Sequence, residues 1–139
     1  MTSDEFDVVE AVRQIMLDNP AIYAVIGARI YPMGKPLGGT LPEASYKRVS
    51  EVVEWGSGVK TVRLQITVID DDYSDVLKAA RIIRGDKETL TGIDGYSGEK
   101  LGVKIKSIAF MNQTDDNDHD ASGVTTVWYV NTDYQVVFR

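Results

Sequence analysis

Apolar residues recur at helical spacing near the start of the chain. Val8, Val12 and Ile15 lie four and three residues apart, which places them on one face of a helix. Thr2 and Glu5 stand before them with the spacing of a capping box, in which a hydroxyl and a carboxylate satisfy backbone donors at the helix start. The pattern therefore predicts a first amphipathic helix.

A second, shorter helix is predicted over residues 21–26. Asn19 is a good capping residue, Pro20 favours a helix start, and Gly27 can take the left-handed conformation that often ends helices. A short strand is then expected over residues 29–31.

The next segment, residues 33–42, is rich in glycine and proline. It holds three glycines and two prolines, which predicts a mobile loop. Gly34, Gly38 and Gly39 do not have the spacing of a phosphate-binding loop, so we interpret them as points of flexibility.

The clearest strand of the chain is Thr61–Asp70. Apolar and polar residues alternate along it, the period of two expected for a sheet that has one face on a core: Val62, Leu64, Ile66 and Val68 against Arg63, Gln65 and Thr67. The β-branched and aromatic residues of Ala44–Val53 predict a strand before it. We expect these two strands to form an antiparallel hairpin.

Three consecutive acids, Asp70-Asp71-Asp72, precede a second long amphipathic segment. Tyr73, Val76, Ala80 and Ile83 recur there at helical spacing. Neighbouring carboxylates can share a magnesium ion or raise each other's pKa, but a helix N-terminus also favours negative charge. We prefer the second interpretation, a helix start, for these acids.

The last third of the chain alternates again. Val103 and Ile105 are expected on one face of a strand, and Ile108 and Phe110 on the other. Val124–Phe138 is a long β-rich segment that should pair with it.

Between these two strands lies Asn112–Gly123, which is polar throughout. It is too long for a tight hairpin turn, so we expect an extended, mobile loop.

The order of elements predicts an α+β fold. We expect a mainly antiparallel sheet with two long helices packed on one face, and extended loops. The sequence shows no repeat and no linker-like composition, so residues 1–139 should form a single α+β domain. An apolar fraction of 43% is enough for a real core at this length.

Charge and composition exclude several classes of function. The chain has 21 acidic and 15 basic residues, and a net charge of −6 opposes non-specific attraction to nucleic acid or to an anionic membrane. It has no cysteine, which excludes thiolate chemistry and cysteine-bound zinc. No apolar run has the roughly 18 residues of a membrane span. Acids stand where a signal peptide has basic residues, so we expect a cytoplasmic protein.

The sharpest local signal is a row of alternating acids. Asp116, Asp118 and Asp120 have the oxygen spacing that opens a calcium loop. The sixth position of such a loop needs glycine and is Ala121, and the twelfth needs glutamate and is Val127. These three aspartates are therefore weak metal candidates, and we expect no metal site.

Two alternatives to a structural role stay open. One is a small ligand- or metal-binding α+β module that uses the acidic loop, residues 115–120. The other is a hydrolase, which would need carboxylates such as Asp71 and Asp75 drawn together in a cleft. His119 is the only histidine and has no nucleophile motif near it. We expect no catalytic residues, no cofactor and no enzymatic activity.

Several segments resemble one known family along nearly the whole chain. They are a short helix followed by Gly27-Ala28-Arg29-Ile30-Tyr31-Pro32, a Gly/Pro loop that ends in Leu41-Pro42, the strand Val62–Val68 that leads into a helix, and the closing Asp133-Tyr134-Gln135-Val136-Val137-Phe138. In these features the sequence is similar to the tail completion or tail terminator proteins of long-tailed bacteriophages and prophages, which are related to tail-to-head joining proteins.

The resemblance implies a structural protein. Members of such a family assemble, usually as hexamers, into a ring that caps the tail tube and forms the surface on which the head docks. The implied partners are other copies of this chain, the tail tube protein and the head-completion or connector protein. The implied location is the head-proximal end of the virion tail, with the host cytoplasm as the place of assembly.

Exposed loops and aromatic residues are the natural assembly contacts of such a subunit. Our candidates are Met33, Lys35, Leu37, Trp55, Asp116, Asp118, His119 and Asp120. No family catalytic residues exist to be matched, and neither nucleic-acid sequence recognition nor membrane binding is expected.

Overall fold

A computed structural model gives the fold and describes residues 5–32, 41–53, 56, 58–119, 121–123 and 125–139. It has three helices and six strands within this part of the chain. Their bounds are α1 Glu5–Asp18, α2 Pro20–Ile26, β1 Ile30–Pro32, β2 Glu43–Val53, β3 Lys60–Asp70, α3 Tyr73–Arg84, β4 Gly98–Lys100, β5 Val103–His119 and β6 Thr125–Phe138.

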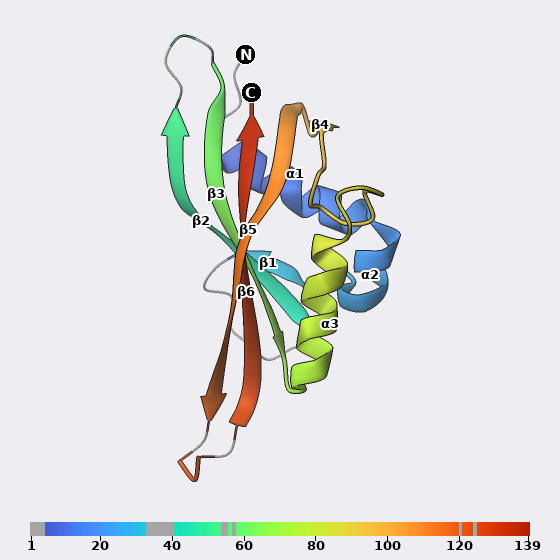
Figure 1. The fold of residues 1–139 in the computed structure, drawn as a ribbon, viewed down its shortest axis with the longest axis vertical. Helices are drawn as coiled ribbons and strands as arrows, with labels where there is room; N and C mark the ends of the chain where they lie inside the picture. Colours follow the sequence, from blue (N-terminus) through green and yellow to red (C-terminus); the bar gives the residue numbers. More distant parts are fainter. Residues whose placement is uncertain (1–4, 33–40, 54–55, 57, 120, 124) are drawn as a thin grey trace.

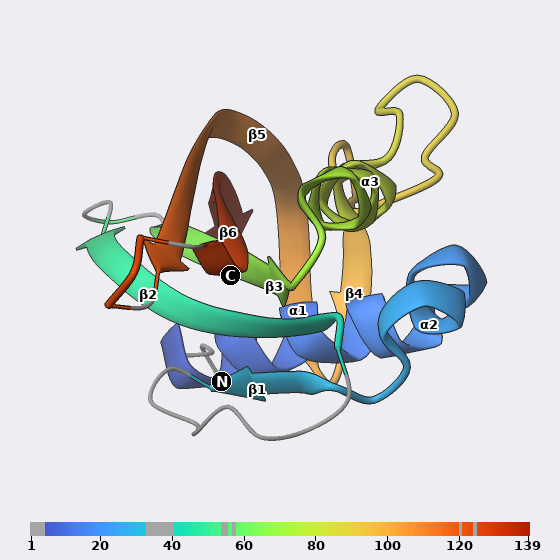
Figure 2. The same cartoon turned by 90° about the horizontal axis from the view of Figure 1, so that it is seen from below.

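The strands form one mixed sheet in the order β1-β2-β3-β6-β5-β4. β1 is parallel to β2, and every other neighbouring pair is antiparallel. The three helices lie together on one side of this sheet (Figure 1), and the view from below shows how strongly the strands curl (Figure 2).

The expected α+β fold, a mainly antiparallel sheet with two long helices on one face, is wrong. The structure is mostly β, with 49% strand and 26% helix, and its six strands curl into a mixed half-barrel. The helices are short, with 14, 7 and 12 residues. The main cause of the error is that most of a segment interpreted as a loop belongs to β5, the longest strand.

The two predicted N-terminal helices are confirmed, although Thr2 of the expected capping box lies outside the described residues. The α1 residues Val8, Val12 and Ile15 are all buried, as their spacing requires. Asn19 caps α2, because its Oδ1 accepts hydrogen bonds from the backbone N–H groups of Ala21 and Ile22 at 3.0 and 3.2 Å.

Arg29 fixes the parallel pairing of β1 with β2. Its Nη2 donates to the carbonyl of Val25 at 3.1 Å, and its Nε donates to that of Pro42 at 2.9 Å. The carbonyl of Arg29 accepts the N–H of Ala44 at 2.9 Å. One residue thus joins the end of α2 to the start of β2.

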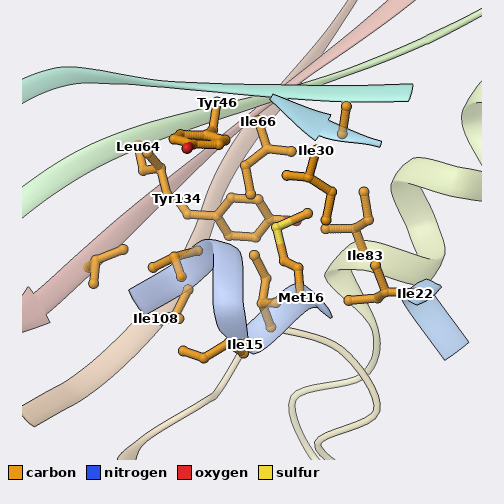
Figure 3. Packing of buried hydrophobic residues seen from close by; sticks show 14 of the residues in the cluster. Ile15, Met16, Ile22, Ile30, Tyr46, Leu64, Ile66, Ile83, Ile108 and Tyr134 are labelled. Atoms are coloured by element: carbon orange, nitrogen blue, oxygen red, sulfur yellow. The ribbon is translucent and has the colours of Figure 1, made fainter. Parts of the chain in front are cut away.

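The core lies between the sheet and the helices. The alternation predicted for β3 is confirmed, since Val62, Leu64, Ile66 and Val68 are each 1% exposed. Figure 3 shows Tyr134 of β6 at the centre of the cluster of buried side chains. Its hydroxyl is the one buried side-chain polar atom without a hydrogen-bond partner in the described part of the chain.

The faces expected for β5 are wrong in one respect. Ile108 was expected opposite Val103 and Ile105, but all three are buried on the helix side. The register with β6 shifts between Ile105 and Ser107, which shows a β-bulge at Lys106. One extra residue reverses the alternation after that point, so Ile108 turns to the core.

The loop expected at Asn112–Gly123 is also wrong for most of its length. β5 continues through Asp116 and Asn117 to His119 and pairs with β6 along that whole length. Asp and Asn are rare in strands, but the residues opposite Asp115–Asp118 on β6 are Val130, Tyr129, Trp128 and Val127, which all favour strand structure.

The chain after α3 passes very close to the helix end. Gly85 follows α3 with a φ of 67°, and a Cβ on it would lie 2.0 Å from the backbone nitrogen of Gly92. Both positions therefore require glycine. No helix within the described residues combines the length and apolar character needed to cross a membrane.

Candidate assembly interface

The longest projection of the molecule is the distal half of the β5–β6 pair. We define the distal ribbon as Asn112–His119 of β5 together with the residues of β6 that pair with them, Thr125–Asp133. It extends away from the helices at one end of the molecule, while β2 and β3 extend at the opposite end (Figure 1).

Tyr73, the first residue of α3, supports the distal ribbon on its helix side. Its hydroxyl donates to Asp115 Oδ2 at 2.6 Å, and this bond raises the pKa of Tyr73. Its ring also packs against Trp128 of β6, with the ring centroids 4.6 Å apart. The ribbon is therefore braced by a helix terminus and is more than a free hairpin.

Tyr129 fixes the other face of the distal ribbon. Its hydroxyl donates to Asp118 Oδ2 across the strand pair. This hydrogen bond to a carboxylate, with burial and the charges of Asp118 and Asp116 in addition, raises the pKa of Tyr129 to about 12. Two tyrosine–aspartate bonds on opposite faces thus hold the acidic strand in place.

The alternating acids do not form a calcium loop in the part that the structure describes. Asp116 and Asp118 lie two apart on β5 and are both exposed, and Asp120 lies outside the described residues. Asp116 Oδ1 accepts a hydrogen bond from the backbone N–H of the next residue, Asn117, at 2.8 Å, so this carboxylate has a partner within its own strand. Among the described residues, no three histidine, cysteine or carboxylate side chains gather where they could hold a metal ion.

The acids before α3 act at the helix start. Asp72 is the N-cap, and its Oδ1 accepts the N–H of Asp75 at 3.0 Å. Asp71 and Asp75 are both exposed and do not lie in a cleft of the kind that an acid–base pair needs.

The predicted assembly contacts divide into two sets. Asp116, Asp118 and His119 lie exposed on the distal ribbon, as a contact surface requires. The remaining candidates lie outside the described residues: Met33, Lys35, Leu37, Trp55 and Asp120.

A second exposed edge, which sequence reasoning missed, lies on β2. β1 pairs only with Ala44–Tyr46, so no strand among the described residues pairs with Lys47–Val53 on the side away from β3. Val49 and Val52 on this stretch are 47% and 65% exposed. The sequence signal that could have indicated this edge is the presence of Val49 and Val52 in a strand that also carries charged residues.

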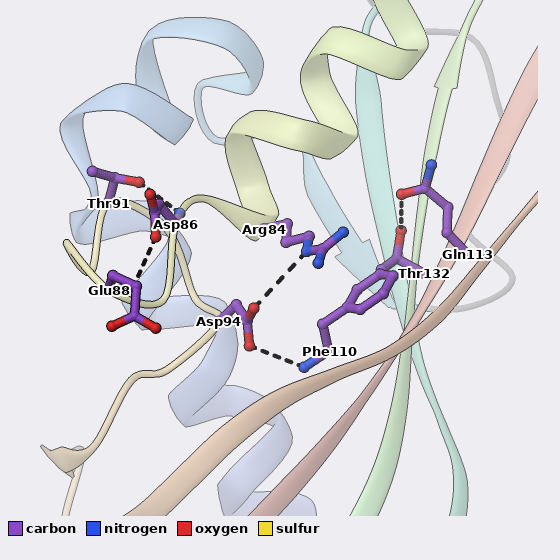
Figure 4. A network of polar contacts seen from close by, with 8 residues as sticks. All are labelled: Arg84, Asp86, Glu88, Thr91, Asp94, Phe110, Gln113 and Thr132. Atoms are coloured by element: carbon purple, nitrogen blue, oxygen red, sulfur yellow. Dashed lines mark hydrogen bonds and ion pairs between the residues drawn. The ribbon is translucent and has the colours of Figure 1, made fainter.

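One shallow pocket of about 520 Å³ lies between the end of α3 and β5. Arg84 stacks over the ring of Phe110 at 3.6 Å, and its Nε is 3.9 Å from Asp94 Oδ2 (Figure 4). Asp94 Oδ1 accepts the N–H of Phe110 at 3.0 Å. Arg84 and Asp94 therefore join the end of α3 to β5 at this pocket.

The comparisons with known proteins give a fold and no family. No family model matches the sequence, and no curated protein matches it. The fold is similar to that of a chain in a solved structure described as the virion of a native gene transfer agent (GTA) particle, with a TM-score of 0.71 and 12% identity. The match covers 96% of this chain and 95% of that one.

Proposed function

We propose that this chain is a structural protein of a phage-like particle. In the proposed role, copies of it assemble into a ring, most simply a hexamer, that caps the tail tube. The same ring provides the surface on which the head docks. The partners are then other copies of the chain, the tail tube protein and the head-completion or connector protein.

The observation that carries this proposal is the extent of the fold similarity to the virion chain. The match spans nearly the whole of both chains, so it is a similarity of complete subunits and not of one shared hairpin. A fold alone does not fix a function. The proposal therefore also needs features of this chain that suit assembly.

The shape of the molecule suits a ring subunit that has different neighbours at its two ends. The distal ribbon projects at one end, and the β2–β3 pair projects at the other (Figure 1). An interface between unlike surfaces repeats around a ring, whereas an interface between like surfaces ends at a dimer. The proposed place of the ring is the head-proximal end of the tail, reached after assembly in the host cytoplasm.

Nothing in the described residues favours the metal-binding alternative. Among the acids that suggested it, Asp116 and Asp118 lie on β5, where Asp118 is bonded to Tyr129, and the neighbouring Asp115 is bonded to Tyr73. A structural use of these acids accounts for the same residues without a cation.

The test is deletion of the gene from the phage or prophage that encodes it, followed by electron microscopy of the lysate. Overlong or ragged tail tubes with unattached heads are the result expected of a tube cap. Intact particles in normal numbers would contradict the proposal. Tails of normal length that lack heads would support the proposed role in head docking and would contradict the proposed role in capping the tube.

A further inference from the structure

The two exposed strand edges of the sheet lie on opposite sides of it. β5 is covered by β4 over Val103–Ile105, and residues 94–96 cover it as far as Phe110 through hydrogen bonds to Ile108 and Phe110. Beyond Phe110, no described residue pairs with the outer side of β5. At the other side of the sheet, β2 has its exposed edge at Lys47–Val53.

These two edges have similar lengths. Each runs for about seven residues, Asn112–Asp118 on β5 and Lys47–Val53 on β2. Strand edges of this length that have no neighbouring strand among the described residues can accept a further strand, and natural monomers usually block such edges with charge or covering loops. Lys47, Arg48 and the bulge at Val49 protect the β2 edge only in part, since Val49 and Val52 stay exposed on it.

The two edges also differ in charge. The β5 edge carries Asp115, Asp116 and Asp118 and no basic residue. The β2 edge carries Lys47 and Arg48 with one acid, Glu51, whose carboxylate lies 3.4 Å from Arg48 Nη1. Two acidic edges repel each other, whereas an acidic edge and a basic, apolar edge attract.

The side chains that would meet lie on matching faces. Lys47 is opposite Gln65 of β3, and Asp116 is opposite Tyr129 of β6. Gln65 and Tyr129 both alternate with buried residues, so they lie on the sheet face away from the helices. Lys47 and Asp116 therefore share that outer face.

We propose that the β5 edge of one copy pairs with the β2 edge of the next copy, so that the sheet continues from subunit to subunit. The occupant of each edge is thus a second copy of this chain, held by main-chain hydrogen bonds and by attraction between the basic β2 edge and the acidic β5 edge, whose charged residues Lys47 and Asp116 share the outer face. This inference rests on the proposed ring and names its contact surface. Because the two edges are unlike, the contact repeats head to tail and leaves no free β5 edge in a closed ring.

Engineered cysteines test the pairing directly, because the chain has none of its own. The double variant Val52→Cys/Thr114→Cys places one thiol on each edge, both on the outer face, since Val52 is opposite Thr61 and Thr114 is opposite Asn131. Oxidation at high protein concentration should give a ladder of covalent oligomers on a denaturing gel. Each single variant should give no product larger than a dimer.

The register between copies is not fixed by the monomer, so a second pair is needed. Val52→Cys/Asn112→Cys moves one thiol by two residues on the same face of β5. Failure of both pairs to form products beyond the dimer overturns the edge pairing. Strong dimers from Val52→Cys alone would also overturn it, in favour of a β2–β2 contact.

A charge swap tests the predicted specificity. Asp116→Lys should abolish the covalent ladder, and the added change Lys47→Glu should restore it. The matched control is Asp86→Lys, which reverses an exposed acid in the segment after α3 and should leave the ladder intact. Loss of the ladder in the control, or no rescue by the second change, contradicts a specific charge pair.

Light scattering on the unmodified protein separates this inference from the proposed function. If the protein self-associates while neither cysteine pair crosslinks, the ring stands and the edge pairing fails. If it stays monomeric at every concentration and no pair crosslinks, both the self-assembling ring and the edge pairing are overturned for the free protein.

Discussion

Arg63 and Asp133 form a bidentate contact on the outer face of the sheet. Arg63 Nε and Nη2 donate to the same carboxylate oxygen of Asp133, at 3.1 and 2.5 Å, across the β3–β6 pair. Gln65 Nε2 donates to the other oxygen at 3.0 Å. The Asp133 side chain is only 10% exposed, so this carboxylate depends on partners from the protein.

Replacement of Asp133 should therefore destabilise the fold. We expect Asp133→Ala to lower the free energy of unfolding by about 2 kcal/mol, because hydrogen bonds to a charged group are lost and Arg63 and Gln65 lose their acceptor. Urea unfolding measures the effect. Gln135→Ala, an exposed neighbour on the same face, should change it by less than about 0.5 kcal/mol.

The buried hydroxyl of Tyr134 should be dispensable. It lacks a hydrogen-bond partner in the described part of the chain, and burial, with the nearby charge of Asp94 as a smaller cause, raises the pKa of Tyr134. We expect Tyr134→Phe to raise the free energy of unfolding by about 1 kcal/mol, since an unpaired polar group returns to water only on unfolding.

Tyr46→Phe is the matched control for this change. Tyr46 is also buried, but its hydroxyl donates to Glu10 Oε1 at 3.2 Å, so its removal should lower stability. A loss of stability in Tyr134→Phe as large as in Tyr46→Phe would point to a partner for the Tyr134 hydroxyl.

The bond between Tyr129 and Asp118 should make stability fall at high pH. The pKa of Tyr129 rises from 10.0 to about 12, so near pH 11 the folded chain keeps a proton that the unfolded chain has lost. The contribution is therefore fully present below pH 10 and is lost as the pH rises through about 12. Urea midpoints measured across this range should fall less steeply for Tyr129→Phe than for the unchanged protein. Tyr23→Phe, a change of an exposed tyrosine on α2, should leave the slope unaltered.

Asp72 should stabilise α3 as its cap. We expect Asp72→Ala to lower the free energy of unfolding by about 1 kcal/mol, because the N–H of Asp75 loses its acceptor. Asp71→Ala removes an exposed charge one residue earlier without removing the cap and should cost clearly less. Equal losses in the two variants would mean that general charge at the helix start, and not capping, is the stabilising factor.

The sequence was most informative where local rules decide the structure. The cap at Asn19, the spacing of Val8, Val12 and Ile15, and the acids before α3 all depend on residues close in the chain. β3 was equally clear, because its alternation is unbroken. The bounds predicted for α2 and β3 differ from those of the structure by one residue each.

The wrong predictions concern elements whose structure depends on pairing between strands that are distant in the sequence. Nothing near Ile30 indicates that β1 runs parallel to β2, since that pairing closes over a segment of glycines and prolines. The bulge at Lys106 has no signature in the local sequence, so the sheet face on which Ile108 lies was predicted wrongly. Asp115–Asp118 lack strand propensity and are strand only because β6 pairs with them.

The same limits apply to the candidate site. Asp116, Asp118 and His119 were chosen as candidate contacts from composition, and the structure shows them exposed; their role in assembly stays a prediction. The tyrosine bonds that hold this half, and the open edge at Val49 and Val52, follow from strand order, which one sequence does not reveal.

β5 contains two bulges, and each of them reverses which residues of the strand, odd-numbered or even-numbered, face the helices. Before the first, at Lys106, odd-numbered residues face the helices; between the bulges, even-numbered residues do; after the second, near Met111, odd-numbered residues do so again. Each bulge residue is an extra one opposite the β6 ladder, so a variant that lost Lys106 or Met111 would have a regular ladder at that point. Every acid of the distal ribbon would keep its present β6 partner, and Asp115 would stay beside Tyr73. A single deletion at either bulge should accordingly be tolerated, whereas a single deletion in the regular stretch Asn112–Asp118 moves the residues on one side of it to the opposite face.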